Sequence, residues 1–397
     1  MGGMVTGMRD FLPKEKALRE EALSVIRDTY RSYGFQEIET PALEDIDVLR
    51  GSDGGDNMKM TFDVIKRRLK PEELQKATSG KELVDLGLRF DLTVPLARFY
   101  ADNKALLPNV FRSIQIAPVW RAERPQKGRF RQFIQCDIDV IGEAGSLAEI
   151  ELVTVTAAIL DALGVTGYRI RMNDRNLLNS FLNTANVPED KQAQSLIILD
   201  KSDKISPEKI VEELSVLLED ETMVQALVRS YALTEEDELS SIIKSVNELA
   251  GKDIAIFDPT LIRGMGYYTG TIFEVTLPDG TTSVGGGGRY DRMIGRFLKT
   301  DIPAVGFSLG FERIVDLVEL NTTPIRNIAI VYGKDVPNVQ LLKISKIFIA
   351  DGIQVRLVGK AKNTKKQLDD LKADGFTGFV FVNAGNENKD LIVRDFS

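Results

Sequence analysis

Residues 120–139 read WRAERPQKGRFRQFIQCDID, and this stretch places a charged loop between two apolar runs. Apolar residues lead up to Trp120, and the apolar pattern resumes at Phe133. The pattern predicts a strand, a loop and a returning strand. Guanidinium groups bind phosphate oxygens two at a time, so a basic loop between buried strands is suited to holding a polyanion over a sheet. The loop carries five basic residues: Arg121, Arg124, Lys127, Arg129 and Arg131.

Acidic residues lie among these basic ones. Glu123 is inside the loop, and Asp137 and Asp139 follow on the returning strand. Such carboxylates bind amino groups or cationic ligands. The alternative is a solvated hairpin of mixed charge, because runs of charged residues usually face solvent.

The composition is that of a soluble globular protein. The 397 residues allow two or three domains, 43% of them are hydrophobic and 28% are charged. We expect no membrane span and no secretory signal, since no apolar run is long enough. The single cysteine, Cys136, lies in an apolar run, so a disulfide framework is impossible within the chain. These features predict a cytoplasmic protein.

The chain contains no histidine, which limits the chemistry available to it. Imidazole bases, histidine metal sites and Ser-His or Cys-His pairs are excluded. Catalysis must rest on carboxylates, Lys, Arg, Tyr, backbone donors or the ligand itself. The net charge of −8 does not indicate nucleic-acid binding, which would need local basic patches.

The first part of the chain predicts a helix over 14–33, ended by Gly34, and a strand over 35–41. Residues 62–70 and 82–88 are expected to pair as a hairpin. Arg89, Asp91 and Thr93 then alternate with apolar residues, which places them on one face of a strand. A carboxylate and a hydroxyl on one wall suit an α-amino group. The alternative is a polar strand edge followed by a helix from about Val94.

After the central hairpin, residues 146–163 predict a helix capped by Ser146, with Glu149 at the capping-box position. A short strand is expected over 168–172. Residues 174–249 lack glycine and are charged, and we interpret them as an inserted or linking helical module.

The chain becomes glycine-rich after Asp258. LIRGMGYYTG (261–270) leads into a strand, and SVGGGGRYD (283–291) precedes a helix. Four successive glycines allow close approach of a ligand, although a tight turn is the alternative. The stretch is not a P-loop, since it has no Gly-Lys-Ser/Thr ending. PAVGFSLGFER (303–313) predicts a strand running into a helix. Residues 327–397 alternate strand and helix, which indicates a small α/β domain with a largely parallel sheet.

These segments resemble class II aminoacyl-tRNA synthetases, and within them the histidyl-tRNA synthetases, over essentially the whole chain. FRSIQIAPVWRAERPQKGRFRQFIQCDIDVIG (111–142) resembles motif 2, and PAVGFSLGFER resembles motif 3. The segment ending at Pro41 resembles motif 1. LIRGMGYYTGTIFEV and GGGGRYD resemble the two histidine-specific segments. Gly266 and Ile134 depart from residues that many members carry there.

The resemblance implies an α+β fold: an antiparallel sheet flanked by helices, with a helical insertion and a C-terminal α/β anticodon-binding-like domain. The implied parts are 1–173 for the first half of the catalytic core, 174–252 for the insertion, 253–322 for the second half and 325–397 for the C-terminal domain. It also implies a homodimer formed through motif 1.

The resemblance implies a histidine–tRNA ligase that uses ATP with Mg²⁺, L-histidine and tRNA(His). Three arginines are the implied catalytic residues. Arg121 would hold the α-phosphate of ATP, Arg263 would lie on the other side of that phosphate, and Arg313 would hold the γ-phosphate. Glu123 would contact the adenine amino group, and Phe133 would stack on the ring. Arg124 and Gln126 would face the tRNA acceptor end.

The implied histidine site has two ends. The α-amino group would be bound by Asp91, Thr93 and Gln135, and the imidazole would be recognised by Asp139 and Tyr268. Tyr267 is a weaker member of the site, and Arg263 is shared with the nucleotide. The alternative function is a non-aminoacylating paralogue, such as the regulatory subunit of ATP phosphoribosyltransferase in histidine biosynthesis. The C-terminal domain and the retained arginines favour the ligase.

Overall fold

The protein is described from a computed structural model that covers residues 3–51, 60–125, 128–199, 201, 205–230, 237–262, 267–278, 282–318, 326–386 and 391–396. It forms two compact units, Met1–Leu320 and Asn321–Ser397, which are described separately. The finer division into four parts stays a prediction. Within the described ranges, no helix is both long and apolar enough to cross a membrane.

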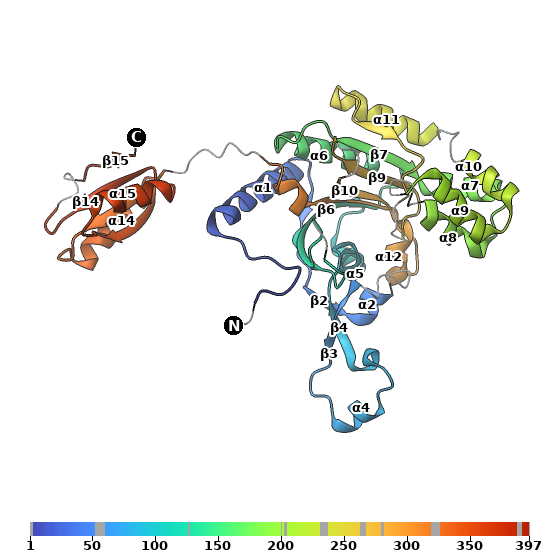
Figure 1. Ribbon diagram of the computed structural model, residues 1–397, viewed down its shortest axis with the longest axis horizontal. Helices are drawn as coiled ribbons and strands as arrows, with labels where there is room; N and C mark the ends of the chain where they lie inside the picture. The colour runs from blue at the N-terminus through green and yellow to red at the C-terminus, as the bar shows by residue number, and fades with distance from the viewer. Residues whose placement is uncertain are drawn as a thin grey trace. The chain divides into compact units, whose positions relative to one another are not determined.

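An eight-stranded sheet forms the centre of the first unit (Figure 1). The strands are antiparallel to their neighbours except at the two edges, where β1 pairs with β5 and β8 pairs with β7 in parallel. The α+β fold expected from the sequence is confirmed. In spatial order the strands are β1 (Gln36–Glu37), β5 (Phe111–Trp120), β6 (Gln132–Ile141), β11 (Ala304–Gly310), β10 (Ser283–Arg289), β9 (Thr271–Thr276), β7 (Arg169–Asp174) and β8 (Ala255–Phe257).

One face of this sheet is covered by three helices, which share one apolar core with it. Alternate residues of β6 supply that core with Cys136, Ile138 and Val140, all fully buried. Tyr30 also belongs to it, and its hydroxyl donates a hydrogen bond to the Cys136 carbonyl at 3.1 Å. The covering helices are α1 (Pro13–Ser32), α6 (Leu147–Ala162) and α11 (Asp237–Ala250).

The opposite face carries a second core and a polar pocket. Helices α5 (Thr93–Asn103) and α12 (Asp291–Leu298) pack there. Four further helices contribute to the same core: α7 (Arg175–Thr184), α8 (Glu189–Leu199), α9 (Pro207–Leu218) and α10 (Glu221–Ser230). The helical character expected after residue 174 is confirmed. Helix α11 also belongs to the stretch expected to be helical, but it packs with α6 in the first core.

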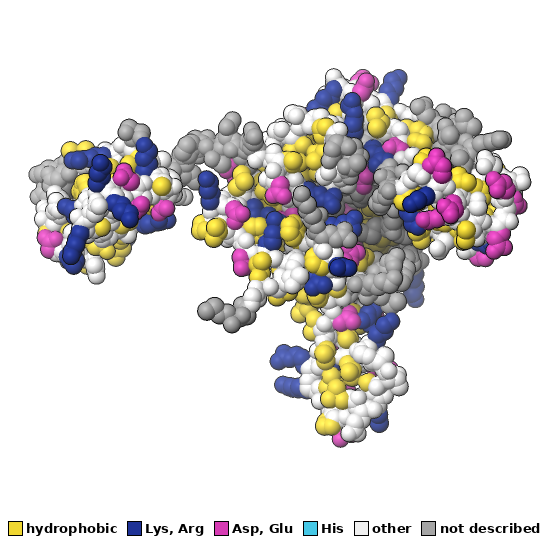
Figure 2. All heavy atoms as spheres, in the orientation of Figure 1, with side chains coloured by type: hydrophobic (Ala, Val, Ile, Leu, Met, Phe, Trp, Pro, Cys, Tyr) yellow, Lys and Arg dark blue, Asp and Glu magenta, His cyan; other side chains and the backbone are white. Residues whose placement is uncertain are grey.

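A small three-stranded sheet projects from the first unit (Figure 1). The hairpin expected from the sequence is present within it, and Figure 2 shows both basic and hydrophobic side chains on its surface. Its elements are β2 (Leu43–Asp45), α2 (Ile46–Arg50), β3 (Phe62–Ile65), α4 (Pro71–Lys76), η1 (Gly80–Leu83) and β4 (Val84–Leu88).

Two expectations for the first part of the chain are wrong. The strand expected over 35–41 is reduced to β1, with one further backbone bond from Ile38 to Ile114. Arg89, Asp91 and Thr93 do not alternate along a strand, because β4 ends at Leu88 and α5 begins at Thr93. The Arg89 guanidinium instead donates to backbone carbonyls, including Thr40 at 2.6 Å.

The capping box at the start of α6 is also wrong. The Ser146 side chain makes no capping bond, and Glu149 pairs with Arg289 of β10 instead. The four glycines, 285–288, form the middle of β10, so the tight-turn alternative is excluded. A side chain at Gly287 would lie 1.9 Å from the Gly306 carbonyl oxygen, which explains the need for glycine in this strand.

The second unit is the expected small α/β domain. Its four-stranded sheet has the order β13-β12-β14-β15, parallel except for the last pair. A final strand is expected near 391–393 from the apolar residues there, and the structure has it at Arg394–Asp395 instead. The elements are β12 (Asn327–Tyr332), α14 (Asn338–Ala350), β13 (Gln354–Gly359), α15 (Thr364–Ala373), β14 (Gly378–Val382) and β15 (Arg394–Asp395).

Candidate active site

A pocket of about 410 Å³ lies on the face of the large sheet opposite α1 and α6. Its floor is made by β6, β11 and the glycines of β10. The loop after β5, the start of α5 and residues 267–268 make its walls. Ten of the thirteen residues expected to form the site line it: Asp91, Thr93, Arg121, Glu123, Phe133, Gln135, Asp139, Tyr267, Tyr268 and Arg313.

The other three expected residues do not line the described pocket. Arg124 is exposed on the loop and is not part of the lining. Arg263 and Gln126 lie outside the residues that the structure describes, and so does Gly266. The roles implied for all of them stay predictions.

Strand β6 presents its polar residues to the pocket in a single row. Gln135, Asp137 and Asp139 alternate with the buried apolar residues of the other face. Their partners on β11 are Gly310, Ser308 and Gly306, so small side chains leave room above the row. Two carboxylates can therefore be accommodated on a buried strand, because both side chains line the pocket and not the apolar core.

Asp139 is held by a tyrosine from the glycine-rich segment. The Tyr290 hydroxyl donates to Asp139 Oδ1 at 2.6 Å, and both side chains are buried. Burial raises the pKa of Asp139 to about 7. A Cβ atom at Gly306 would lie 2.0 Å from Asp139 Oδ1, so that glycine is required for the carboxylate to occupy its position.

Asp91 occupies the opposite wall, in the turn before α5. Its Oδ1 accepts from the Val94 backbone N–H at 3.2 Å, an interaction that helps to start the helix. Burial raises the pKa of Asp91 to about 6, although that bond and Arg121 lower it. Tyr267 and Tyr268 line the same region, with their rings 4.7 Å apart.

Several lining residues are not among the site residues that the resemblance implies, and Asp137, which the charge pattern alone had marked as a possible amino-group ligand, is the most prominent. It lies between the two expected residues Gln135 and Asp139, and it is 3% exposed. Burial and the neighbouring Asp139 raise the pKa of Asp137 well above its usual range. The alternation of the strand was the signal that could have identified it. Arg129, already noted among the basic residues of the loop, is a further lining residue outside the implied site. The others with polar side chains are Glu274, Ser283, Tyr290, Ser308 and Glu312.

The cationic end of the pocket is formed by arginines. The Arg121 guanidinium donates to the Phe90 carbonyl at 3.1 Å and lies 5.1 Å from the centre of the Phe133 ring. Arg313, in the short helix α13 (Phe311–Val315), donates to the Ser283 carbonyl. Arg129 lines the same end, and burial lowers the pKa of Arg313.

Glu312 fixes the helix that carries Arg313. It accepts two hydrogen bonds from Arg19 of α1, each 2.7 Å long, and it also pairs with Arg9. One of its oxygens accepts from the Ile134 backbone N–H at 3.2 Å. Glu312 therefore joins the first helix, the central hairpin and the cationic end.

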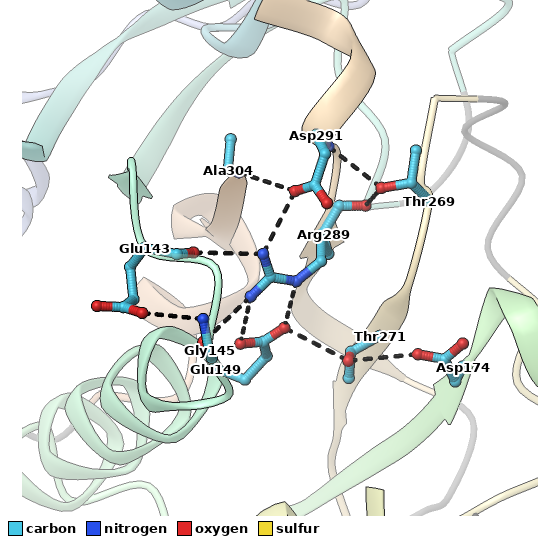
Figure 3. Close-up of polar contacts among 9 residues, drawn as sticks. All are labelled: Glu143, Gly145, Glu149, Asp174, Thr269, Thr271, Arg289, Asp291 and Ala304. Carbon is cyan, nitrogen blue, oxygen red and sulfur yellow. Dashed lines mark hydrogen bonds and ion pairs between the residues drawn. The ribbon is translucent and has the colours of Figure 1, made fainter. Parts of the chain in front are cut away.

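Arg289 supports the acidic end in a similar way (Figure 3). Its guanidinium binds both oxygens of Glu149, at 2.7 and 2.8 Å, and it also contacts Asp291 at 3.3 Å. Asp291 in turn accepts from the Ala304 N–H at 2.9 Å. The pair therefore fixes the segment on both sides of Tyr290, which holds Asp139.

Among the residues described, no group of three or more Cys, Asp, Glu or His side chains is arranged to hold a metal ion. The pocket thus has three buried aspartates on one side and three arginines on the other, where the buried Glu312 lies next to Arg313 in sequence. Such a pocket binds a cationic or amino ligand beside a polyphosphate. An antiparallel sheet carrying such a site on one face, between helices, is the arrangement expected of a class II aminoacyl-tRNA synthetase.

Comparisons with known proteins agree with this class. The family model described as histidyl-tRNA synthetase matches residues 7–314. The histidine–tRNA ligase of Leifsonia xyli subsp. xyli is 49% identical, and the alignment covers 95% of this chain and 94% of the relative. The crystal structure of histidyl-tRNA synthetase from Nostoc sp. superposes with a TM-score of 0.79 at 27% identity, covering 99% of this chain and 94% of that one.

A structure described as an ATP phosphoribosyltransferase regulatory subunit/histidyl-tRNA synthetase, from Bacillus halodurans, superposes with a TM-score of 0.74. It covers 97% of this chain and 99% of that chain. At 19% identity it shows the shared fold alone.

This chain belongs to the histidyl-tRNA synthetase family. The resemblance expected from the motifs is confirmed, and the protein is an aminoacyl-tRNA synthetase that uses ATP as a substrate.

Proposed function

We propose that this protein activates L-histidine with ATP and transfers it to the 3′ end of tRNA(His). The observation that carries the proposal is the division of the pocket into a buried acidic end and a cationic end. Family membership supplies the substrate class. The acidic end suits the ammonium and imidazole groups of histidine, and the arginines suit the triphosphate.

In the first step a carboxylate oxygen of histidine attacks the α-phosphorus, and the bond to the leaving pyrophosphate breaks. Arg121 would neutralise the charge that develops on the α-phosphate, and Arg313 would hold the γ-phosphate. Their place at one end of the pocket supports these roles. Arg263 is proposed on the other side of the α-phosphate. Phe133 would stack on adenine beside Glu123.

In the second step the terminal ribose hydroxyl of the tRNA attacks the carbonyl carbon of histidyl-adenylate, and AMP leaves. The hydroxyl proton passes to a phosphate oxygen of the adenylate, so no protein base is required. Arg124 and Gln126 are proposed to face the acceptor end. Magnesium is proposed to enter with ATP, since the described residues offer no three-ligand group for it.

The second unit is proposed to bind the anticodon. Residues 321–397 contain twelve Lys and Arg against eight Asp and Glu, a net charge of +4, while the whole chain has −8. This local excess of basic residues supports contact with an RNA backbone. A homodimer and a cytoplasmic location are proposed from family membership.

The test is charging of total tRNA with labelled histidine by the purified protein. We expect histidine to become attached to tRNA in an ATP-dependent reaction that Arg263→Ala lowers at least about 100-fold, the effect typical of losing one transition-state donor. Folded protein that charges no tRNA would overturn the proposal and would favour the alternative function, a non-aminoacylating regulatory paralogue.

A further inference from the structure

Four buried acceptor atoms face this pocket without a hydrogen-bond partner within the described part of the chain. Each belongs to a side chain that is at least nine-tenths buried. An acceptor without a partner in such a place is costly unless a ligand satisfies it. The four atoms are Asp91 Oδ2, Gln135 Oε1, Asp137 Oδ1 and Asp139 Oδ2.

Three of these residues occupy one row of β6. Residues four apart on a strand are separated by about 13 Å, so a ligand that touches both Gln135 and Asp139 passes over Asp137. The second oxygen of Asp137 lies 3.5 Å from the Gln135 amide nitrogen. That same nitrogen donates to Ser308 at 2.9 Å. Asp137 therefore has one oxygen held by its neighbours and one directed at the ligand space.

The number of acceptors matches the donors of the proposed substrate. An ammonium group has three N–H donors, and an imidazole ring has one or two. Asp139, held by Tyr290, is proposed for the ring, which leaves the unpartnered acceptors of Asp91, Gln135 and Asp137 for the ammonium. Thr93 also lines the pocket, but its hydroxyl already has a partner in Tyr267.

We propose that Asp137 is a specificity-determining residue that binds the α-ammonium group of the amino acid together with Asp91 and Gln135. This inference rests on the proposed function and adds a second carboxylate to the amino-group site. The raised pKa of Asp137 is consistent with it, since burial and the neighbouring Asp139 disfavour its charged form and a bound cation would favour that form.

The test compares two ligands by calorimetry: L-histidine and 3-(imidazol-4-yl)propionate, which lacks the amino group. Asp137→Asn is expected to weaken histidine binding roughly 10- to 100-fold, the effect of losing one charged hydrogen bond. It is expected to leave the affinity for the deamino ligand within about twofold of the wild type. Asp161→Asn provides the matched control, because Asp161 pairs with Lys252 and does not line the pocket.

Equal histidine affinity in Asp137→Asn and the wild type would overturn the assignment. Equal losses for both ligands would also overturn it, since Asp137 would then act on the ring or on the shape of the pocket. ATP affinity and the melting temperature report on folding, and Asp137→Ser supplies the same comparison if the asparagine variant does not fold. Wild-type protein that binds no histidine would instead overturn the proposed function, and the inference with it.

Discussion

The two ends of the pocket are built in different ways. The acidic end is formed by the central strand β6 and by Asp91 in the turn before α5. Its aspartates are almost fully buried, and several of their oxygens have no partner among the residues described. The cationic end is formed by a loop and a short helix, and Arg129 and Glu123 there are exposed. The rigid end is suited to selecting one amino acid, whereas the exposed end is suited to admitting a nucleotide and then the end of a tRNA.

Replacing Arg121 is expected to give the largest difference between the two ends, measured as a loss of reaction rate without a loss of histidine affinity. Arg121→Ala removes a donor to the charge that develops at the α-phosphate, so the rate of histidine-dependent ATP–pyrophosphate exchange is expected to fall roughly 1,000-fold. Histidine affinity, measured by calorimetry, is expected to stay within about threefold. Arg169→Ala, on an exposed arginine bonded to the Asp253 carbonyl, serves as the control. A similar loss of histidine affinity and of exchange rate would show that the two ends do not work separately.

Replacing Asp139 is expected to weaken histidine binding and to leave ATP binding almost unchanged. Asp139→Asn removes the charge that is proposed to recognise the ring, so the dissociation constant for histidine is expected to rise roughly 10- to 100-fold. ATP affinity, measured separately, is expected to change little. Tyr290→Phe removes only the hydroxyl bonded to Asp139 and is expected to give a smaller loss in the same direction. Unchanged histidine affinity in Asp139→Asn would remove this residue from the ring site.

The pH dependence of histidine binding separates the ends further. The pKa values of Asp91 and Asp139 are raised to about 6 and about 7, and that of Asp137 is also raised. The other titratable or charged side chains that face these three aspartates include Arg121 and Tyr290. A protonated carboxyl must lose its proton before it binds a cation. The affinity for histidine is therefore expected to fall as the pH drops through 7 and then through 6. Below the pKa of each carboxyl, its protonation lowers the affinity by about tenfold per pH unit.

The histidine ring itself titrates near pH 6.5, so the comparison is made between variants rather than with the wild type alone. Asp139→Asn should flatten the part of the curve near pH 7. An identical curve in the variant would show that Asp139 does not titrate on binding.

The smallest effect on binding is expected from Arg289, whose role is support. Arg289→Ala leaves Glu149 buried and unpaired, which typically costs about 3–5 kcal/mol of unfolding free energy. Histidine affinity of the folded protein is expected to fall only a few-fold, through a less constrained Tyr290. Chemical denaturation measures the first quantity and calorimetry the second. If Arg289→Ala leaves stability unchanged, the bidentate pair is not the support that its geometry indicates.

Much of this arrangement could be predicted from the sequence. The hairpin around Trp120, the helix at the N-terminus and the α/β character of the second unit follow from apolar periodicity and turn residues. The sequence motifs identify ten of the residues that line the pocket. Such local patterns are reliable because they depend on neighbours in sequence.

The failures share one cause, which is contact between distant segments. Glu149 looks like a capping residue by its spacing, yet it pairs with Arg289, 140 residues later. Glu312 and Arg19, 293 residues apart, show no sign of their pairing in the sequence. The glycines at 285–288 resemble a loop, and only the close approach of β11 explains why they form a strand. Asp137 is different, because its charge and the alternation along β6 mark it in the sequence, although the family motifs do not assign it a role.

The most direct test of the divided pocket is ATP–pyrophosphate exchange by the full chain, run with each of the twenty amino acids in turn. We predict exchange with L-histidine alone, because its imidazole N–H is proposed to donate to Asp139 while its ammonium meets Asp91, Gln135 and Asp137, all of which line the pocket. Exchange with other amino acids at comparable rates would contradict selection by the acidic end. No exchange from folded protein that binds ATP would contradict the account as a whole.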